Sequence, residues 1–267
     1  MTTTVPPRMP TAVDVLAPVA AALRASGAGD RSVLTPGLLV PDDTGWIPAT
    51  QLIDGPELPR LLAAARVHWR ASPHAAAALV WKSYSYWVTL PAVLGWASAH
   101  RVPLVAPGDV LLKPDDDGVI PVIGLRPSIT IAVAPDTPRP LSELPQVHRA
   151  ASETELLELL RSSLLDAHLG PIVDRLRREV RIGTRTLLGS LASGVATGVL
   201  RAAHILPGTA AEHIAALTEA LGVADLIELV PGSNGRPALR RKTCCLGFTL
   251  PQPRVCSGCC ITSAQRS

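Results

Sequence analysis

The chain has 267 residues, 47% of them hydrophobic and 18% charged, with a formal net charge of +3. This composition is too apolar for a disordered chain and too often interrupted for a polytopic membrane protein. The nearly balanced charge and the scarce aromatic residues also argue against a nucleic-acid-binding surface. Residues 1–10 are rich in Thr and Pro and lack the basic and apolar regions of a signal peptide, so we predict a cytoplasmic protein.

The N-terminal half reads as a mixture of helices and short strands. Helical spacing predicts helices over residues 12–25, 58–71 and 74–99, the last bent or broken at Pro91. A loop-rich stretch is expected over residues 27–45, and short β-rich runs are found at 46–52, 109–113, 119–123 and 128–134. Residues 114–118 are typical of a hairpin turn, which makes Asp115, Asp116 and Asp117 a solvated turn rather than a cation site.

The second half, after a proline-dense connection at residues 135–145, carries well-marked helices. The predicted spans are 153–165, 171–181, 184–206 and 209–222. Capping boxes open the first and last of them, at Ser152/Glu155 and Thr209/Glu212, and Pro171 suits a first helical turn. Small residues in the third should allow close packing: Gly189, Ser193, Gly194, Thr197 and Gly198.

We therefore predict an α+β fold, mainly helical, with a small antiparallel sheet in the N-terminal half and an irregular C-terminal tail. The expected divisions are a mixed α/β segment, 1–140, a helical segment, 141–235, and a cluster-binding tail, 236–267. Two apolar stretches, 75–99 and 186–200, are expected to be buried helices. Lys82 and Pro91 interrupt the first, and the second is shorter than the roughly 20 residues of a membrane span.

All five cysteines lie between residues 244 and 260, which indicates metal binding rather than a disulfide framework. Their pattern is CC-x10-C-x2-C, formed by Cys244, Cys245, Cys256 and Cys259, with Cys260 to spare. The C-x2-C pair can place both sulfurs on one metal, and Gly258 would permit the tight turn. The adjacent pair needs an irregular backbone to converge on one metal, or must serve two irons.

Four thiolates suit either a structural zinc ion or an iron–sulfur cluster. Adjacent cysteines are poor spacing for a zinc knuckle, so the spacing favours iron–sulfur. Zinc and a redox or disulfide role stay open as alternatives, although a vicinal Cys244–Cys245 disulfide would close a strained ring.

The tail closely resembles that of the FhuF-type ferric siderophore reductases, whose signature is the same C-terminal CC-x10-C-x2-C. The resemblance implies that Cys244, Cys245, Cys256 and Cys259 hold a [2Fe–2S] cluster. Leu246 and the basic run from Arg240 to Lys242 are also similar to the family. The rest of the chain resembles, more loosely, the ferric-reductase-like domain at the end of siderophore synthetases. Cys260 departs from the pattern and is either a spare thiol or a replacement for Cys259.

Positive charge near such a cluster favours its reduced form, and backbone N–H groups of Leu246, Ser257 and Gly258 could bond to the sulfurs. The basic residues could equally be a solvated surface. They are Arg236, Arg240, Arg241, Lys242 and Arg254.

Elsewhere the candidates are weaker. Lys82, Tyr84 and Tyr86 lie among tryptophans and could line a ligand cleft or simply belong to a buried helix; Arg126 could meet an anionic chelate. No histidine forms a metal-binding pair, so core or surface positions are expected for His68, His74, His100, His148, His168, His204 and His213.

The sequence has neither a dinucleotide-binding nor a phosphate-binding glycine motif, so electrons must come from a separate donor, such as a ferredoxin or a flavin-dependent reductase. We expect a ferric-siderophore reductase that releases Fe(II), with peripheral association at the inner membrane. The alternatives are a non-catalytic [2Fe–2S] carrier or sensor and a zinc-stabilised binding module.

Overall fold

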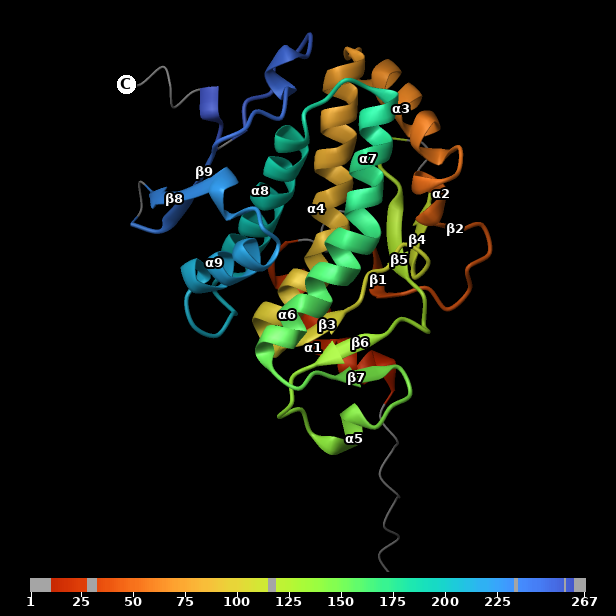
Figure 1. The fold of residues 1–267 in the computed structure, drawn as a ribbon, viewed down its shortest axis with the longest axis vertical. Coiled ribbons are helices and arrows are strands. Elements are labelled where there is room, and N and C mark those ends of the chain that lie inside the picture. Colours follow the sequence, from red (N-terminus) through yellow and green to blue (C-terminus); the bar gives the residue numbers. More distant parts are fainter. Residues whose placement is uncertain (1–10, 28–32, 115–118, 233–234, 257, 262–267) are drawn as a thin grey trace, which may run out of the picture.

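The computed structural model of the protein describes residues 11–27, 33–114, 119–232, 235–256 and 258–261. It is an α+β structure, mainly helical with short strands, as the sequence predicts. Figure 1 shows helix α4 running through the middle, with one sheet beside it and helix α8, helix α9 and the C-terminal tail on its other side. The predicted Asp115–Asp117 turn lies outside the described residues.

Helix α4, Pro73–Ala99, is the centre of the core. The Ser72 side chain caps its start by accepting from the Ala75 N–H at 3.2 Å, and His100 ends it in a left-handed conformation. Nearly every residue from Val80 to Ala97 is buried, so the helix is apolar on all sides rather than amphipathic. It continues through Pro91, so of the two predicted outcomes, a bend or a break, the break is wrong. Packing on every side offsets the lost backbone hydrogen bond.

Helix α8, Thr184–Ala202, packs against α4 through the small residues that the sequence marked. A Cβ atom at Gly198 would lie 2.5 Å from Leu90 Cδ2, and one at Gly194 would lie 3.5 Å from Tyr86. Glycine at Gly198 therefore lets the two helices approach this closely without a shift of the Leu90 side chain, while Gly194 has room for one more methyl group.

The other helices of the described residues are α1 (Ala12–Ala25), α2 (Thr50–Ile53), α3 (Glu57–His68), α5 (Arg139–Ser142), α6 (Glu153–Arg161), α7 (Gly170–Glu179) and α9 (Ala210–Ala220). All begin within one residue of their predicted starts except the two short ones. Helix α2 overlaps the run 46–52 that was predicted as β-rich, where only Ile47–Pro48 forms a strand, and α5 lies in the predicted proline-dense connection. The Thr209/Glu212 capping box is confirmed in both directions. Ser152 also caps its helix, but the Glu155 carboxylate accepts from Ala151 N instead of Ser152 N. Between α6 and α7 the chain stays helical as a π-helix, Ser162–Leu169, so these helices end at other residues than predicted.

Three small sheets complete the fold of the described residues. Their strand orders are β1-β5-β4-β2, β3-β6-β7 and β8-β9, and their bounds are β1 (Leu34–Leu39), β2 (Ile47–Pro48), β3 (Arg101–Pro103), β4 (Val110–Lys113), β5 (Val122–Leu125), β6 (Ile131–Val133), β7 (Val147–Arg149), β8 (Ile227–Pro231) and β9 (Pro237–Arg241). The predicted antiparallel pairing is present between β4 and β5, whereas β1–β5 and β6–β7 are parallel. Strand β1 lies in the stretch that was predicted as a loop, because its Pro36 and Gly37 are residue types that rarely occur inside strands.

Buried apolar side chains form one cluster that runs from α1 to β8, and it includes residues of both the predicted N-terminal and helical segments. The three-part division therefore stays a prediction. Within the described part of the chain, no helix combines the length and the apolarity that crossing a membrane requires.

A buried polar network links α4 to the π-helix. The Nδ1–H of His168 donates to the Val105 carbonyl at 2.6 Å, which leaves Nε2 to accept from the Tyr84 hydroxyl at 2.6 Å. Both side chains are buried, and burial lowers the pKa of His168 to about 4. His168 is thus a satisfied core histidine, as expected, and Tyr84 belongs to the core rather than to a cleft.

This network predicts a loss of stability in acid. Below the ordinary histidine pKa of 6.5, His168 is protonated in the unfolded chain. In the folded protein it stays neutral until the pH approaches 4. The free energy of unfolding should therefore fall by about 2 kcal/mol between pH 7.5 and pH 5 on account of this residue. Urea unfolding at both values measures it. His168→Gln should remove this part of the pH dependence, whereas His204→Gln, on the exposed surface, should retain it.

Candidate metal centre

The cysteine motif follows the β8–β9 hairpin, which packs on α8 (Figure 1). Thr243, immediately before Cys244, fits against Gly189 of α8: a Cβ atom at Gly189 would lie 1.9 Å from Thr243 Oγ1. The Lys242 N–H donates to Leu226 O at 3.0 Å and fixes the chain just before this contact. The start of the motif is therefore anchored to the helical core.

Two backbone hydrogen bonds bring the halves of the motif together across the ten-residue gap. Arg241 N donates to Gly258 O, and Arg254 N donates to Gly247 O, each at 2.9 Å. A Cβ atom at Gly258 would lie 2.3 Å from the Leu239 carbonyl oxygen. Gly258 is thus required for the close approach of the second half to β9, a reason beyond the turn that the sequence suggested.

These contacts place one cysteine of each half side by side. Cys245 Sγ and Cys256 Sγ lie 3.9 Å apart. Two thiolates bound at about 2.3 Å to one tetrahedral metal would lie about 3.8 Å apart, so this pair has the spacing of ligands that share a metal ion. It is too long for a disulfide bond, and both residues are free thiols.

The backbone between the halves supplies donors to sulfur. The Leu246 N–H donates to Cys244 Sγ at 3.3 Å, as predicted, and the Gly247 N–H bonds to Cys245. Leu246 adopts a left-handed conformation with φ of 61°, the irregular backbone that two adjacent cysteines were expected to need. Of the other two predicted donors, Ser257 lies outside the described residues, and Gly258 contributes its carbonyl to Arg241.

The close sulfur pair has divergent acidities. The hydrogen bond with Cys256 lowers the pKa of Cys245, and the Gly247 N–H and the charges of Lys82 and Arg241 lower it further against the opposing effect of burial. The same contact, together with burial, raises the pKa of Cys256. One thiolate is therefore stabilised at this position, which is the protonation state that metal ligation requires.

The other cysteines lie close by. Burial raises the pKa of Cys244, with a smaller contribution in the same direction from Cys245, Cys260 and Cys259. Cys259 is 6% exposed, and its N–H donates to Cys256 O at 3.0 Å. Among the described residues no three acidic, histidine or cysteine side chains form a ready metal-binding group. The Cys245–Cys256 spacing and the N–H bonds to sulfur nevertheless fit metal ligation by this pair of thiolates.

A cleft of about 390 Å³ opens beside Cys256, between α4, α8, β9 and the tail. This is within the ~300–1,000 Å³ range of small-molecule sites. Its walls combine cations, hydroxyl groups and aromatic rings. They include Trp69, Lys82, Ser83, Tyr86, Trp87, Ser190, Ser193, Thr197, Arg201, Arg241, Arg254, Cys256 and Gly258.

The cleft contains only some of the residues that the sequence singled out. Lys82, Tyr86, Arg241 and Arg254 line it, whereas Arg240 is an exposed partner of Glu228, 2.5 Å away. Arg201 was missed, although its Nη1 lies 3.3 Å from the Tyr86 hydroxyl. The sequence does contain a signal for Arg201, because it continues the helical spacing of Ser190 and Thr197, which line the same cleft from α8.

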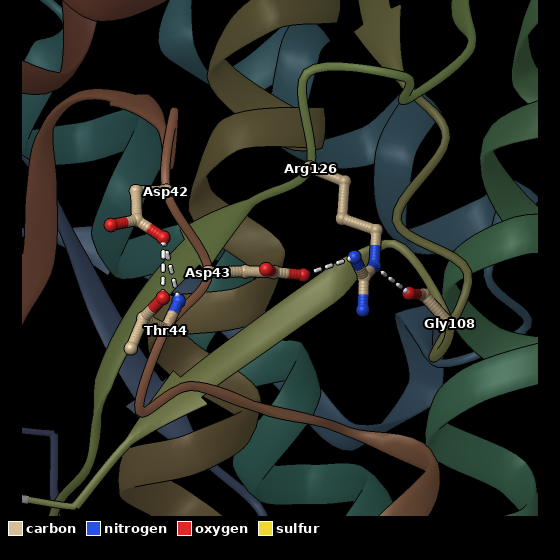
Figure 2. A network of polar contacts seen from close by, with 5 residues as sticks. All are labelled: Asp42, Asp43, Thr44, Gly108 and Arg126. Atoms are coloured by element: carbon tan, nitrogen blue, oxygen red, sulfur yellow. Dashed lines mark hydrogen bonds and ion pairs between the residues drawn. The ribbon is translucent and has the colours of Figure 1, made fainter.

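Arg126 is committed elsewhere. Its Nη1 pairs with Asp43 at 2.6 Å and its Nε donates to Gly108 O at 3.0 Å, beside an Asp42–Thr44 turn (Figure 2). Because Asp43 offsets its charge, Arg126 does not support the suggested contact with an anionic chelate.

No protein-family model matches the chain, and no curated protein matches it.

The contact at Gly189 yields a test of how the motif is held. In Gly189→Ala the new methyl group would displace Thr243 and loosen the tail, at a cost of about 1–3 kcal/mol. The buried thiols of Cys245 and Cys259 should then react roughly tenfold faster with a thiol reagent in metal-free protein. Gly194→Ala, on the same helix but with room for a methyl group, should react at the wild-type rate. Equal rates for all three proteins would contradict this account.

Proposed function

We propose that the protein is a ferric-siderophore reductase that holds a [2Fe–2S] cluster through Cys244, Cys245, Cys256 and Cys259. The observation that carries the proposal is the position of Cys256: it belongs to the close sulfur pair and also lines the cleft. A chelate bound there would lie beside a ligand of the redox centre. When bound, the cluster supplies single-electron reduction.

The residues of the chain would bind and orient the chelate. Trp69, Tyr86 and Trp87 offer flat apolar surfaces, and hydroxyl groups of α8 offer hydrogen bonds. One electron converts Fe(III) to Fe(II), which binds hard oxygen ligands less strongly and leaves the chelator, while the freed oxygens take protons from solvent. The electron comes from a separate donor, a ferredoxin or a flavin-dependent reductase, which is oxidised in return. The cytoplasmic location and peripheral membrane association belong to the same proposal.

A zinc-stabilised module is the second candidate, because the 3.9 Å sulfur spacing suits a zinc ion equally well. Metal analysis separates the two. The reductase requires iron and inorganic sulfide in equal amounts and visible absorption, whereas a zinc protein is colourless.

Serine substitutions test the ligand set. Cys244→Ser, Cys245→Ser, Cys256→Ser and Cys259→Ser should each lose most of the visible absorption of anaerobically purified protein, because oxygen replaces a sulfur ligand. Cys260→Ser is the matched control and should keep its iron. If instead Cys259→Ser keeps its iron and Cys260→Ser loses it, Cys260 is the fourth ligand.

The activity itself is tested with reduced protein. Dithionite-reduced wild-type protein, freed of excess dithionite, should be reoxidised by a ferric siderophore, with one Fe(II) trapped by a ferrous chelator for each electron lost. Cys256→Ser should show no such turnover. Failure of every ferric chelate to reoxidise the reduced protein, with the cluster intact, would leave an electron carrier or sensor as the function.

A further inference from the structure

Arg241 is a buried cation with unused hydrogen-bond donors. Arg241 is only 2% exposed, and its Nη2 donates to Ser190 Oγ at 3.0 Å. Among the described residues, its Nε and Nη1 atoms have no hydrogen-bond partner. Within the described residues no carboxylate forms an ion pair with it. Burying a guanidinium group without acceptors for its donors costs folding free energy. An anion bound from outside the chain would supply these acceptors and offset that cost.

Strand alternation directs this cation specifically to the cleft. Arg240 and Arg241 are neighbours on β9, and their side chains point to opposite faces of the strand. Arg240 is exposed and paired with Glu228, whereas Arg241 lines the cleft. Ser190 of α8 holds the Arg241 guanidinium in place.

The rest of the cleft has the same sign of charge. Lys82 on α4, Arg201 on α8 and Arg254 in the tail line it with Arg241, and no Asp or Glu is found among its described lining residues. Cations gathered in a partly enclosed space, without carboxylates to offset them, raise the local concentration of anions. A four-thiolate [2Fe–2S] cluster would carry a net charge of about −2 when oxidised, which is less than the charge of these four cations.

Resting on the function proposed above, we propose that the cleft selects ferric chelates of net negative charge, such as tris-catecholates and hydroxycarboxylates. Arg241 is the central binding residue, its Nε and Nη1 donating to an oxygen anion of the chelate. Lys82, Arg201 and Arg254 surround the same anion, and the aromatic rings cover its flat arms. Cationic hydroxamate chelates bind this cleft weakly.

Gallium(III) chelates test the inference apart from electron transfer, because gallium(III) is not reduced under these conditions. Calorimetry on the cluster-loaded protein compares a gallium(III) tris-catecholate of charge −3 with gallium(III) desferrioxamine B of charge +1. The anionic chelate should bind at least tenfold more tightly, and its affinity should fall as salt is added. Arg241→Gln should weaken its binding about 10- to 100-fold and leave the cationic chelate unaffected. Arg240→Gln, the neighbouring control, should change neither affinity.

Two further variants keep the test decisive if Arg241→Gln fails to fold. Lys82→Gln and Arg254→Gln alter side chains that are not fully buried, and each should weaken the anionic chelate severalfold. Equal affinity for both chelates would overturn the inference. So would an Arg241→Gln protein whose visible spectrum changes while its affinity for the anionic chelate does not, since Arg241 would then serve only the sulfur site. Charge-selective binding without Fe(II) release would instead count against the reductase activity alone.

Discussion

The site depends on one constraint, the docking of an irregular tail on a rigid helical core at positions where no side chain fits. Thr243 lies against Gly189, and Gly258 approaches the Leu239 carbonyl oxygen more closely than any Cβ atom would allow. Backbone hydrogen bonds then tie Arg241 to Gly258. Because these contacts involve backbone and small residues, they fix the path of the chain rather than its side chains. The 3.9 Å separation of Cys245 and Cys256 follows from that path.

The cleft arises from the same packing. Helices α4 and α8 approach closely where Gly198 meets Leu90, and towards the tail they present polar residues to each other. On α4 the cleft residues include Lys82 and Tyr86, one helical turn apart; on α8 they include Ser190 and Arg201. A helix buried on nearly all sides can expose such a stripe only where a partner element leaves a gap. Here the tail closes the gap only in part, which leaves Cys256 on the cleft wall.

Local signals made the longer helices predictable, whereas contacts between distant residues could not be predicted from the sequence. The Thr209 capping box and the Ser152 cap each depend on neighbours within four residues, so the sequence alone indicates them. The cysteine motif is also a local signal, because all of its residues lie within a short stretch of the sequence. By contrast, Tyr84 meets His168 across 84 positions, and nothing near Tyr84 distinguishes it from Tyr86, which lines the cleft. The rotation of α4 in its packing decides between them. Strand β1 was missed because a Pro-Gly pair resembles a loop, although its pairing with β5 stabilises it.

In the proposed reductase, the charge of the cleft would bear on reduction as well as on binding. When chelated Fe(III) gains an electron, the net charge of the complex becomes more negative by one. Cations held in a partly buried wall stabilise that added charge more than they would in water, because the local dielectric constant is lower. Interactions that strengthen as the electron arrives favour the reduced complex over the substrate. Since Ser190 already holds Arg241 in place, little reorganisation is needed at that moment. A buried, incompletely bonded arginine, costly to the fold alone, thus has a physical reason to stand beside Cys256.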